Sequence, residues 1–297
     1  MESRRIDSSL GSKMFTVFVG LFMAIFLVLT LYPLVNTVAI SFNDGIDAVR
    51  GGIHLWPRKF SMKNYDTVLA LENLMTGFKI TTLRTVIGTL SALFVNALLA
   101  YVVSRKRFLF KRGLSLFWVI TMYVNGGMIP VLVLYQDLHL TNTFWVYVVP
   151  GMVSAWNMLV MRTYMLGLPD SLEESAQLDG AGYWTIFVKI ISPLCKPVYA
   201  TIALFVAVYQ WNSWFDAMLY NKFHTELTTA QYELMKLLSS VMQQGGSADT
   251  AKYANNTVTP VTVRAAATII TILPIVCLYP FLQRYFVTGL TIGGVKE

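Results

Sequence analysis

Long apolar runs recur along this chain, and they restrict what it can fold into more than any other feature. Runs of about 20 residues or more have the length that an α-helix needs to cross the hydrocarbon core of a bilayer. The chain is 55% hydrophobic and 13% charged, which is too apolar for a soluble domain of 297 residues. We therefore expect an all-α membrane protein with six spans, at residues 15–41, 77–103, 113–135, 143–164, 193–215 and 262–284.

The distribution of basic residues orients these spans. Five of the nine residues in the loop 104–112 are Lys or Arg, and short loops dense in these residues stay on the cytoplasmic side. This topology places both termini and the segment 170–193 in the cytoplasm. It also accounts for the net charge of +7 without nucleic acid binding. The first run is too long for the apolar region of a signal peptide, so we expect it to remain as a span.

The external loop 216–261 contains apolar residues at helical spacing from Tyr232 to Met242. They predict an amphipathic helix, which either rests on the outer face of the bundle or docks an external partner.

The expected topology divides the chain into three parts. They are an N-terminal span with the first external segment (1–76), a core transmembrane domain (77–284) and a cytoplasmic tail (285–297).

Several kinds of chemistry have no motif in this sequence. There is no Gly-rich loop ending in Gly-Lys-Ser or Gly-Lys-Thr, so the chain is not expected to bind ATP in the P-loop manner. There is no HExxH or GxSxG motif of a hydrolase. The spans lack the buried acidic residues that proton- or sodium-coupled carriers use. The histidines and cysteines lack metal-ligand spacing. We expect no enzyme activity, no cofactor and no metal in this chain.

The segment 170–197, DSLEESAQLDGAGYWTIFVKIISPLCKP, is the one long charged stretch between two spans on the basic side. Asp170 or Ser171 is expected to cap a short helix, with a Glu three residues on as the capping-box partner. Gly180 and Gly182 are expected to end it, because glycine takes the left-handed conformation cheaply. By itself this pattern fits either an ordinary capped loop or a docking element.

Two further features distinguish the segment. Ala176 and Gly180 are four residues apart, which gives one helix face a small, flat surface that another backbone can approach. Pro193 and Pro197 are placed to open the next span, where a missing N–H is tolerated.

The spacing of this segment resembles the EAA loop of the transmembrane subunits of binding-protein-dependent ABC importers. That pattern is Glu-Ala-Ala, three residues, Gly, nine residues, Ile, one residue and Leu-Pro. Ser175 replaces the first Ala, a small-for-small change, and Ser192 replaces the Leu. The matching positions are Glu174, Ser175, Ala176, Gly180, Ile190 and Pro193.

A cluster of aromatic and polar residues lies at the outer end of the fifth span. Aromatic faces stack on the apolar faces of sugar rings, while Asn, Gln and Asp bond to hydroxyls. An interfacial aromatic belt would also place Trp and Tyr at this depth, although it does not explain the interleaved polar residues. The cluster comprises Tyr209, Gln210, Trp211, Asn212 and Asp216.

Three polar residues lie within other spans. Arg84 is expected to extend its side chain toward the outer interface, with contact to an acidic sugar as the alternative. Asn96 and Asn125 lie deeper, and each is expected to face another helix or a cavity. Interhelical hydrogen bonding and substrate contact are both open for these two.

The resemblance covers the whole chain. The segments Trp56–Tyr65 and Trp211–Tyr220 resemble the first external stretch and the fifth span of carbohydrate-uptake permeases of the maltose-permease class. Within that class, the chain is most similar to the group with the LplC-type and alginate-importer permeases. This likeness implies the fold of a type I ABC importer permease and a multi-pass location in the bacterial inner membrane.

The resemblance also implies partners and roles. It implies a second related permease subunit, two ATPase subunits that bind ATP and Mg, an extracytoplasmic solute-binding protein and an oligosaccharide substrate. The helix at 170–182 would be the coupling helix seated on one ATPase, with Glu174 and Asp179 at the rim of the groove. A permease for another solute, such as glycerol phosphate or an amino acid, fits the EAA loop equally well. A stand-alone secondary carrier is the more distant alternative.

Overall fold

The computed structural model describes residues 10–243 and 258–289, which are helical apart from connecting segments and one β-bridge, between Asn43 and Phe60. These residues form two compact units. The first unit comprises the described residues within Met1–Ala70 and Leu238–Ile270, and the second those within Leu71–Leu237 and Thr271–Glu297. The sequence-based boundaries at residues 76 and 284 divide the chain by its expected membrane topology and stay a prediction.

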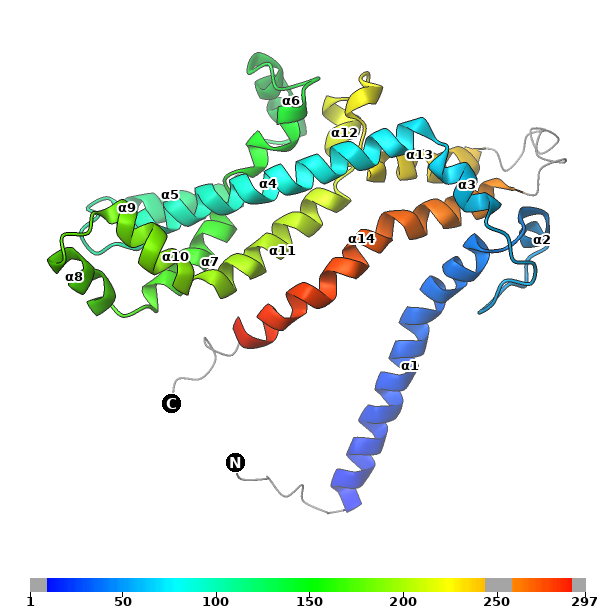
Figure 1. The fold of residues 1–297 in the computed structure, drawn as a ribbon, viewed down its shortest axis with the longest axis horizontal. Coiled ribbons are helices and arrows are strands. Elements are labelled where there is room, and N and C mark those ends of the chain that lie inside the picture. The colour runs from blue at the N-terminus through cyan, green and yellow to red at the C-terminus, as the bar shows by residue number, and fades with distance from the viewer. Residues whose placement is uncertain (1–9, 244–257, 290–297) are drawn as a thin grey trace. The chain divides into compact units, whose positions relative to one another are not determined.

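Three helices are long and apolar enough to cross a bilayer unbroken. They are α1 (Leu10–Ser41), α4 (Glu72–Ser104) and α14 (Pro260–Gly289) (Figure 1). Three further spans are bent pairs of helical segments: α5 (Lys111–Tyr123) with α6 (Met128–Asp137), η1 and η2 (Phe144–Tyr147 and Val149–Gly151) with α7 (Ala155–Leu166), and Tyr183–Leu194 with α11 (Lys196–Asn212). Counted this way, the described residues contain the six expected spans.

The third expected span, 113–135, consists of two helices and not of one continuous helix. The chain direction changes by 117° between its two helices. Asn125 accepts a hydrogen bond from the Gly127 N–H at 2.9 Å through its side-chain oxygen, a local bond that competes with helix formation. Gly127 has a φ of +86°, in the region that only glycine adopts cheaply.

The fifth span also begins earlier than residue 193. The helical chain starts with α9 (Tyr183–Ile186), continues through the π-helical segment η3 (Phe187–Ile191) and α10 (Ser192–Leu194), and bends by 79° before α11. Pro193 and Pro197 both lie in the first turn of their helices, as predicted. Pro197 donates no backbone hydrogen bond, which favours the bend at Cys195.

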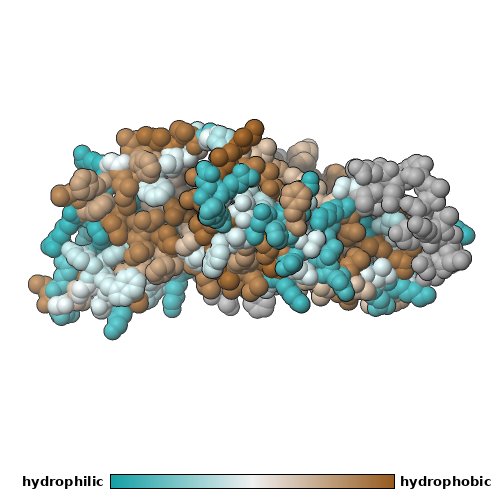
Figure 2. All heavy atoms as spheres, turned by 90° about the horizontal axis from the view of Figure 1, so that it is seen from above, coloured by the Kyte–Doolittle hydropathy of each residue, from teal (hydrophilic) through white to brown (hydrophobic). Residues whose placement is uncertain are grey.

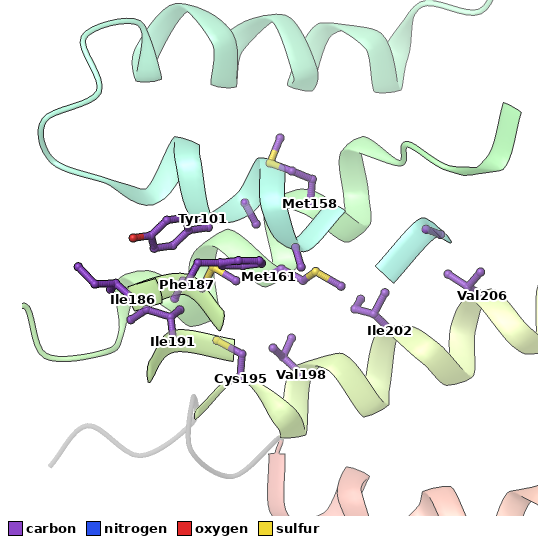
Figure 3. Packing of buried hydrophobic residues seen from close by; sticks show 14 of the residues in the cluster. Tyr101, Met158, Met161, Ile186, Phe187, Ile191, Cys195, Val198, Ile202 and Val206 are labelled. Atoms are coloured by element: carbon purple, nitrogen blue, oxygen red, sulfur yellow. The ribbon is translucent and has the colours of Figure 1, made fainter. Parts of the chain in front are cut away.

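The core of the second unit is a cluster of buried apolar side chains from α4, α7, α9, η3 and α11 (Figure 3). Small residues of α4, Ala92, Ala97 and Ala100, are at most 4% exposed, and they allow α7 and α11 to approach α4 closely. Met158, Met161 and Ile202 fill the space between these helices. This packing fixes the C-terminal half of α4 against the segment that follows α8 (Ser171–Leu178).

The first unit joins the end of α1 to a short fold with α2 (Gly45–Val49) and α3 (Lys63–Leu69). The fold has a polar centre. Asn64 is fully buried, and its side-chain nitrogen donates to the carbonyls of Ser41 and Asn43 at 2.9 and 2.8 Å.

Among the described residues, three further helical segments lie between α11 and α14 in the chain. They are α12 (Phe215–Tyr220), η4 (Thr225–Leu227) and α13 (Ala230–Gln243). The helix α13 confirms the expected helix at 232–242.

Much of the surface is apolar. Figure 2 shows hydrophobic side chains over a large part of the face it displays. The apolar 18-residue stretch of α1 has none of its residues buried within the described structure. Exposed apolar surface of this extent is the surface expected of helices that lie in lipid.

Candidate functional site

The candidate site is α8 and the turn that ends it, where the sequence predicts two glycines in the left-handed conformation. The Ala181 N–H donates to the Ala176 carbonyl at 2.9 Å, and the Gly180 N–H donates to the Gln177 carbonyl at 3.0 Å. This pair of bonds is a Schellman motif. Gly180 has a φ of +80°, whereas Gly182 has a φ of −73° and precedes α9. Gly180 therefore makes the turn, and Gly182 does not.

The predicted capping box is wrong. Asp170 stands at the N-cap position of α8 but makes no side-chain hydrogen bond to the helix. Its carboxylate instead forms an ion pair with Lys106. The Glu173 carboxylate forms an ion pair with Arg105 and accepts a 3.1 Å hydrogen bond from the Gln177 amide. The acidic residues of the first turn are thus directed at the basic loop 104–112, because full opposite charges attract them more strongly than neutral N–H groups.

Arg105 is the centre of this contact. Its guanidinium donates to the Ser104 hydroxyl at 2.9 and 3.1 Å and lies 4.7 Å from the centre of the Tyr101 ring. Tyr101 in turn lies against Phe187. The Arg105–Glu173 pair therefore holds α8 against the C-terminal end of α4. Sequence reasoning used the basic loop for topology only, although opposite charges in two loops on the same side were a signal for this pairing.

The two ion pairs differ in their exposure to water. The side chains of Arg105 and Glu173 are each 15% exposed, whereas those of Lys106 and Asp170 are 76% and 54% exposed. The hydrogen bond with Asp170 raises the pKa of Lys106. Both pairs lie in a pocket of about 480 Å³ that also includes Glu174, Gln177 and Tyr183. The exposed pair is expected to add little stability, and the Arg105–Glu173 pair more.

The side of α8 that faces away from α4 is not covered by any other element among the described residues. Leu178 is 90% exposed, and Glu174, Ser175, Asp179 and Gly180 are exposed beside it. Of the other predicted coupling residues, Ala176 is buried, Ile190 packs against the core and Pro193 is exposed. An exposed Leu among acidic and small residues gives this face the character of a docking surface, and its role stays a prediction.

The predicted substrate-path residues do not come together in one place. Gln210 and Asp216 join a buried network around Arg84. The Arg84 guanidinium donates to the Gln210 oxygen at 3.0 Å and to Asp216 at 3.1 Å, and it lies 4.4 Å from the centre of the Tyr147 ring. Arg84 is 1% exposed, so the expectation that it extends to the outer interface is wrong. Its positive charge is neutralised by Asp216.

The remaining candidates lie elsewhere in the second unit. Tyr209 and Asn212 are exposed, and the Trp211 ring nitrogen donates to the Thr271 carbonyl at 3.0 Å. Asn96 is fully buried; its side chain donates to the Met152 carbonyl at 2.9 Å and accepts from the Ser154 N–H at 3.0 Å. Asn125 is exposed at the break before α6. These bonds give Asn96 an interhelical contact, while its contact with substrate stays a prediction.

The chain belongs to the family of binding-protein-dependent transport system inner membrane components. The family model matches residues 85–292, which include α8 and its turn. The chain is therefore a transport permease subunit of the ABC importer type, as the EAA-like spacing predicts.

The similarity to known proteins extends over nearly the whole chain. The polygalacturonan/rhamnogalacturonan transport system permease protein YtcP of Bacillus subtilis (strain 168) is 30% identical over 288 residues, 96% of this chain and 99% of that protein. Protein LplC of the same organism is 33% identical over 271 residues, 90% of each chain. A chain in the crystal structure of a bacterial ABC transporter involved in the import of the acidic polysaccharide alginate matches with a TM-score of 0.85 and 29% identity, covering 94% of this chain and 98% of that one.

Proposed function

We propose that this chain is one of two related permease subunits of an ATP-driven oligosaccharide importer, coupled to one of two ATPase subunits through α8. The observation that carries the proposal is the arrangement of α8. On one side it is held by the ion pair between Glu173 and Arg105, the residue directly after α4. The side that faces away from α4 is uncovered around Leu178. ATP and Mg are bound by the partner subunits, and an extracytoplasmic binding protein delivers the sugar.

The contacts of α8 support a mechanical role. Dimerisation of the ATPases on binding ATP would displace both coupling helices. Because the Arg105–Glu173 pair and the buried Ala176 attach α8 to the core of the second unit, a displacement of α8 would move that core as a body. The spans would then tilt between inward-open and outward-open states, without covalent chemistry in this chain.

We infer that oligosaccharides containing uronic acids are the first substrates to test. The names of YtcP and of the alginate importer both refer to acidic polysaccharides. Arg84 does not supply the recognition of their carboxylates, because Asp216 already pairs with it. Recognition is expected instead from the binding protein and from polar groups contributed jointly with the second permease.

The test is the ATPase activity of the reconstituted complex. The chain is co-expressed with the products of neighbouring genes, reconstituted in vesicles and supplied with the binding protein and oligogalacturonate, alginate oligosaccharide or a neutral oligosaccharide. Stimulation that needs both the binding protein and an acidic sugar supports the proposal. Stimulation by neutral sugar alone overturns the substrate class, and uptake by this chain without any ATPase overturns the importer.

A further inference from the structure

The segment that follows α2 folds back along the last turns of α1. The Tyr32 hydroxyl lies 2.8 Å from the His54 ring nitrogen Nδ1. The Asn36 side chain donates to the carbonyls of Ile53 and His54 at 2.7 and 3.1 Å, and Ile53 is buried. These contacts hold residues 53 and 54 at the level of Tyr32 and Asn36, rather than beyond the end of α1 at Ser41.

The position of Tyr32 along α1 gives the depth of this contact. Lys13 is the last charged residue before a stretch without charge that continues past the end of α1. About 28 Å of helix separates Lys13 from Tyr32, at about 1.5 Å per residue. The hydrocarbon core of a bilayer is about 30 Å thick. With Lys13 at one surface of the membrane, Tyr32 therefore lies at the opposite surface, and residues 53 and 54 lie there with it.

The next two residues are apolar and uncovered at this depth. Trp56 is 80% exposed and Leu55 is 53% exposed. Tryptophan is enriched where a bilayer meets water, because its ring has an apolar body and a polar N–H. The exposed basic residues Arg50 and Lys59 lie close by in the sequence, and cations are favoured beside lipid phosphates.

The loop is held on its other side as well. The Arg58 side chain donates to the Asp47 carboxylate at 3.0 Å, to the Asp47 carbonyl at 3.0 Å and to the Gly51 carbonyl at 2.7 Å. With His54 held by α1 and Arg58 held by α2, the residues between them have few conformations left to lose. An ordered loop can therefore present its apolar tip to lipid at low entropic cost.

We propose that residues 54–57 form an interfacial anchor that inserts Leu55 and Trp56 into the bilayer surface on the side where α1 ends. The anchor fixes the depth and rotation of α1, whose apolar stretch has no buried residue within the described structure. This apolar tip contacts the membrane, and not a soluble protein.

The test places a spin label at position 56. The full chain carries Trp56→Cys with both native cysteines replaced, in nanodiscs of phosphatidylethanolamine and phosphatidylglycerol. The matched control is Thr67→Cys, on the exposed side of α3. We expect the label at 56 to collide with oxygen several-fold more often, relative to a water-soluble nickel chelate, than the control label does. Equal ratios at the two positions overturn the anchor. Shielding of position 56 from both reagents shows a protein neighbour and also overturns it.

A second measurement uses the native ring. Brominated phospholipids quench the fluorescence of tryptophan that they touch, and Trp56→Phe removes only this tryptophan while keeping an aromatic side chain. The quenched fraction should fall in Trp56→Phe. An unchanged quenched fraction, with the chain still extracted in its folded form, counts against the proposal.

Discussion

Arg84 on α4 forms an ion pair with Asp216 at the start of α12, although the two residues are far apart in the chain and the Arg84 side chain is 1% exposed. Gln210 accepts a further hydrogen bond from the same guanidinium and donates to the Tyr147 carbonyl at 3.1 Å. A buried charge is tolerated only with its partners in place. The pair therefore makes α4, α11, α12 and η1 depend on one another.

Removing one member of this pair is expected to lower the free energy of unfolding more than removing both. Arg84→Met leaves the Asp216 carboxylate without its partner and should lower the free energy of unfolding by about 3 kcal/mol. The double variant Arg84→Met with Asp216→Leu should recover part of that loss. Thermal unfolding of the two single variants and the double variant in detergent measures the coupling. Additive losses would contradict a direct interaction.

A glycine of α4 tests the packing of the same helix. A Cβ at Gly77 would lie 2.8 Å from the Ala230 nitrogen and 2.9 Å from the Thr229 carbonyl carbon, both backbone atoms that cannot move aside cheaply. Gly77→Ala should therefore destabilise the chain by about 1–3 kcal/mol. Gly113→Ala, in α5 with nothing within 4 Å of the added methyl, is the control. It should be neutral or slightly stabilising in the same unfolding measurement.

The spans and the turn at Gly180 were predictable because local chemistry decides them. Apolar length sets a span, and the left-handed position at the end of α8 favours glycine in any surroundings. The break of the third span at Asn125 was overlooked, although the neighbouring Gly126-Gly127 was a visible signal.

The substrate-path cluster was harder to predict. Successive residues of a helix point about 100° apart, so Tyr209, Gln210 and Trp211 cannot share one site. Accordingly Tyr209 is exposed, Gln210 is buried and Trp211 bonds to Thr271. The partner of Arg84 also depends on which helices are neighbours, and apolar periodicity within one span carries no information about that.

The Arg105–Glu173 pair should matter for coupling more than the exposed Lys106–Asp170 pair. Glu173→Arg brings two guanidinium groups together and is expected to lower ATPase stimulation by the binding protein about tenfold, equivalent to roughly 1.4 kcal/mol of coupling. The double variant Arg105→Glu with Glu173→Arg should restore most of it. Lys106→Gln, which breaks the exposed pair, should change stimulation little. A double variant as inactive as the single variant would argue against the pairing.

Asp47 gives the first unit a predictable response to acid. The hydrogen bond from Asn43, with the hydrogen bond and charge of Arg58, holds the pKa of the Asp47 carboxyl below its usual value. Its contribution to stability is thus present above about pH 4 and is lost as pH falls through the lowered pKa of the folded state. Thermal unfolding of Asp47→Asn should depend less on pH below about pH 4 than that of the native chain. Asp66→Asn, which removes an exposed carboxylate of the same segment, is the control, and an equal effect of both would refute the assignment.

Gly180 links the turn of α8 to transport. A side chain at this position meets no neighbouring atom, so the effect of a substitution comes from the φ of +80° alone. Gly180→Val should strain the backbone by about 1–2 kcal/mol and displace α8, abolishing uptake while the complex still assembles in the membrane. Gly180→Asn should retain most activity, because Asn tolerates the left-handed conformation. Gly182→Val, at a φ of −73° and also in open space, is the matched control and should transport normally. Uptake assays with co-purification of the ATPase separate the outcomes: normal transport by Gly180→Val would remove α8 as the coupling element, whereas loss of the ATPase would assign the turn to assembly.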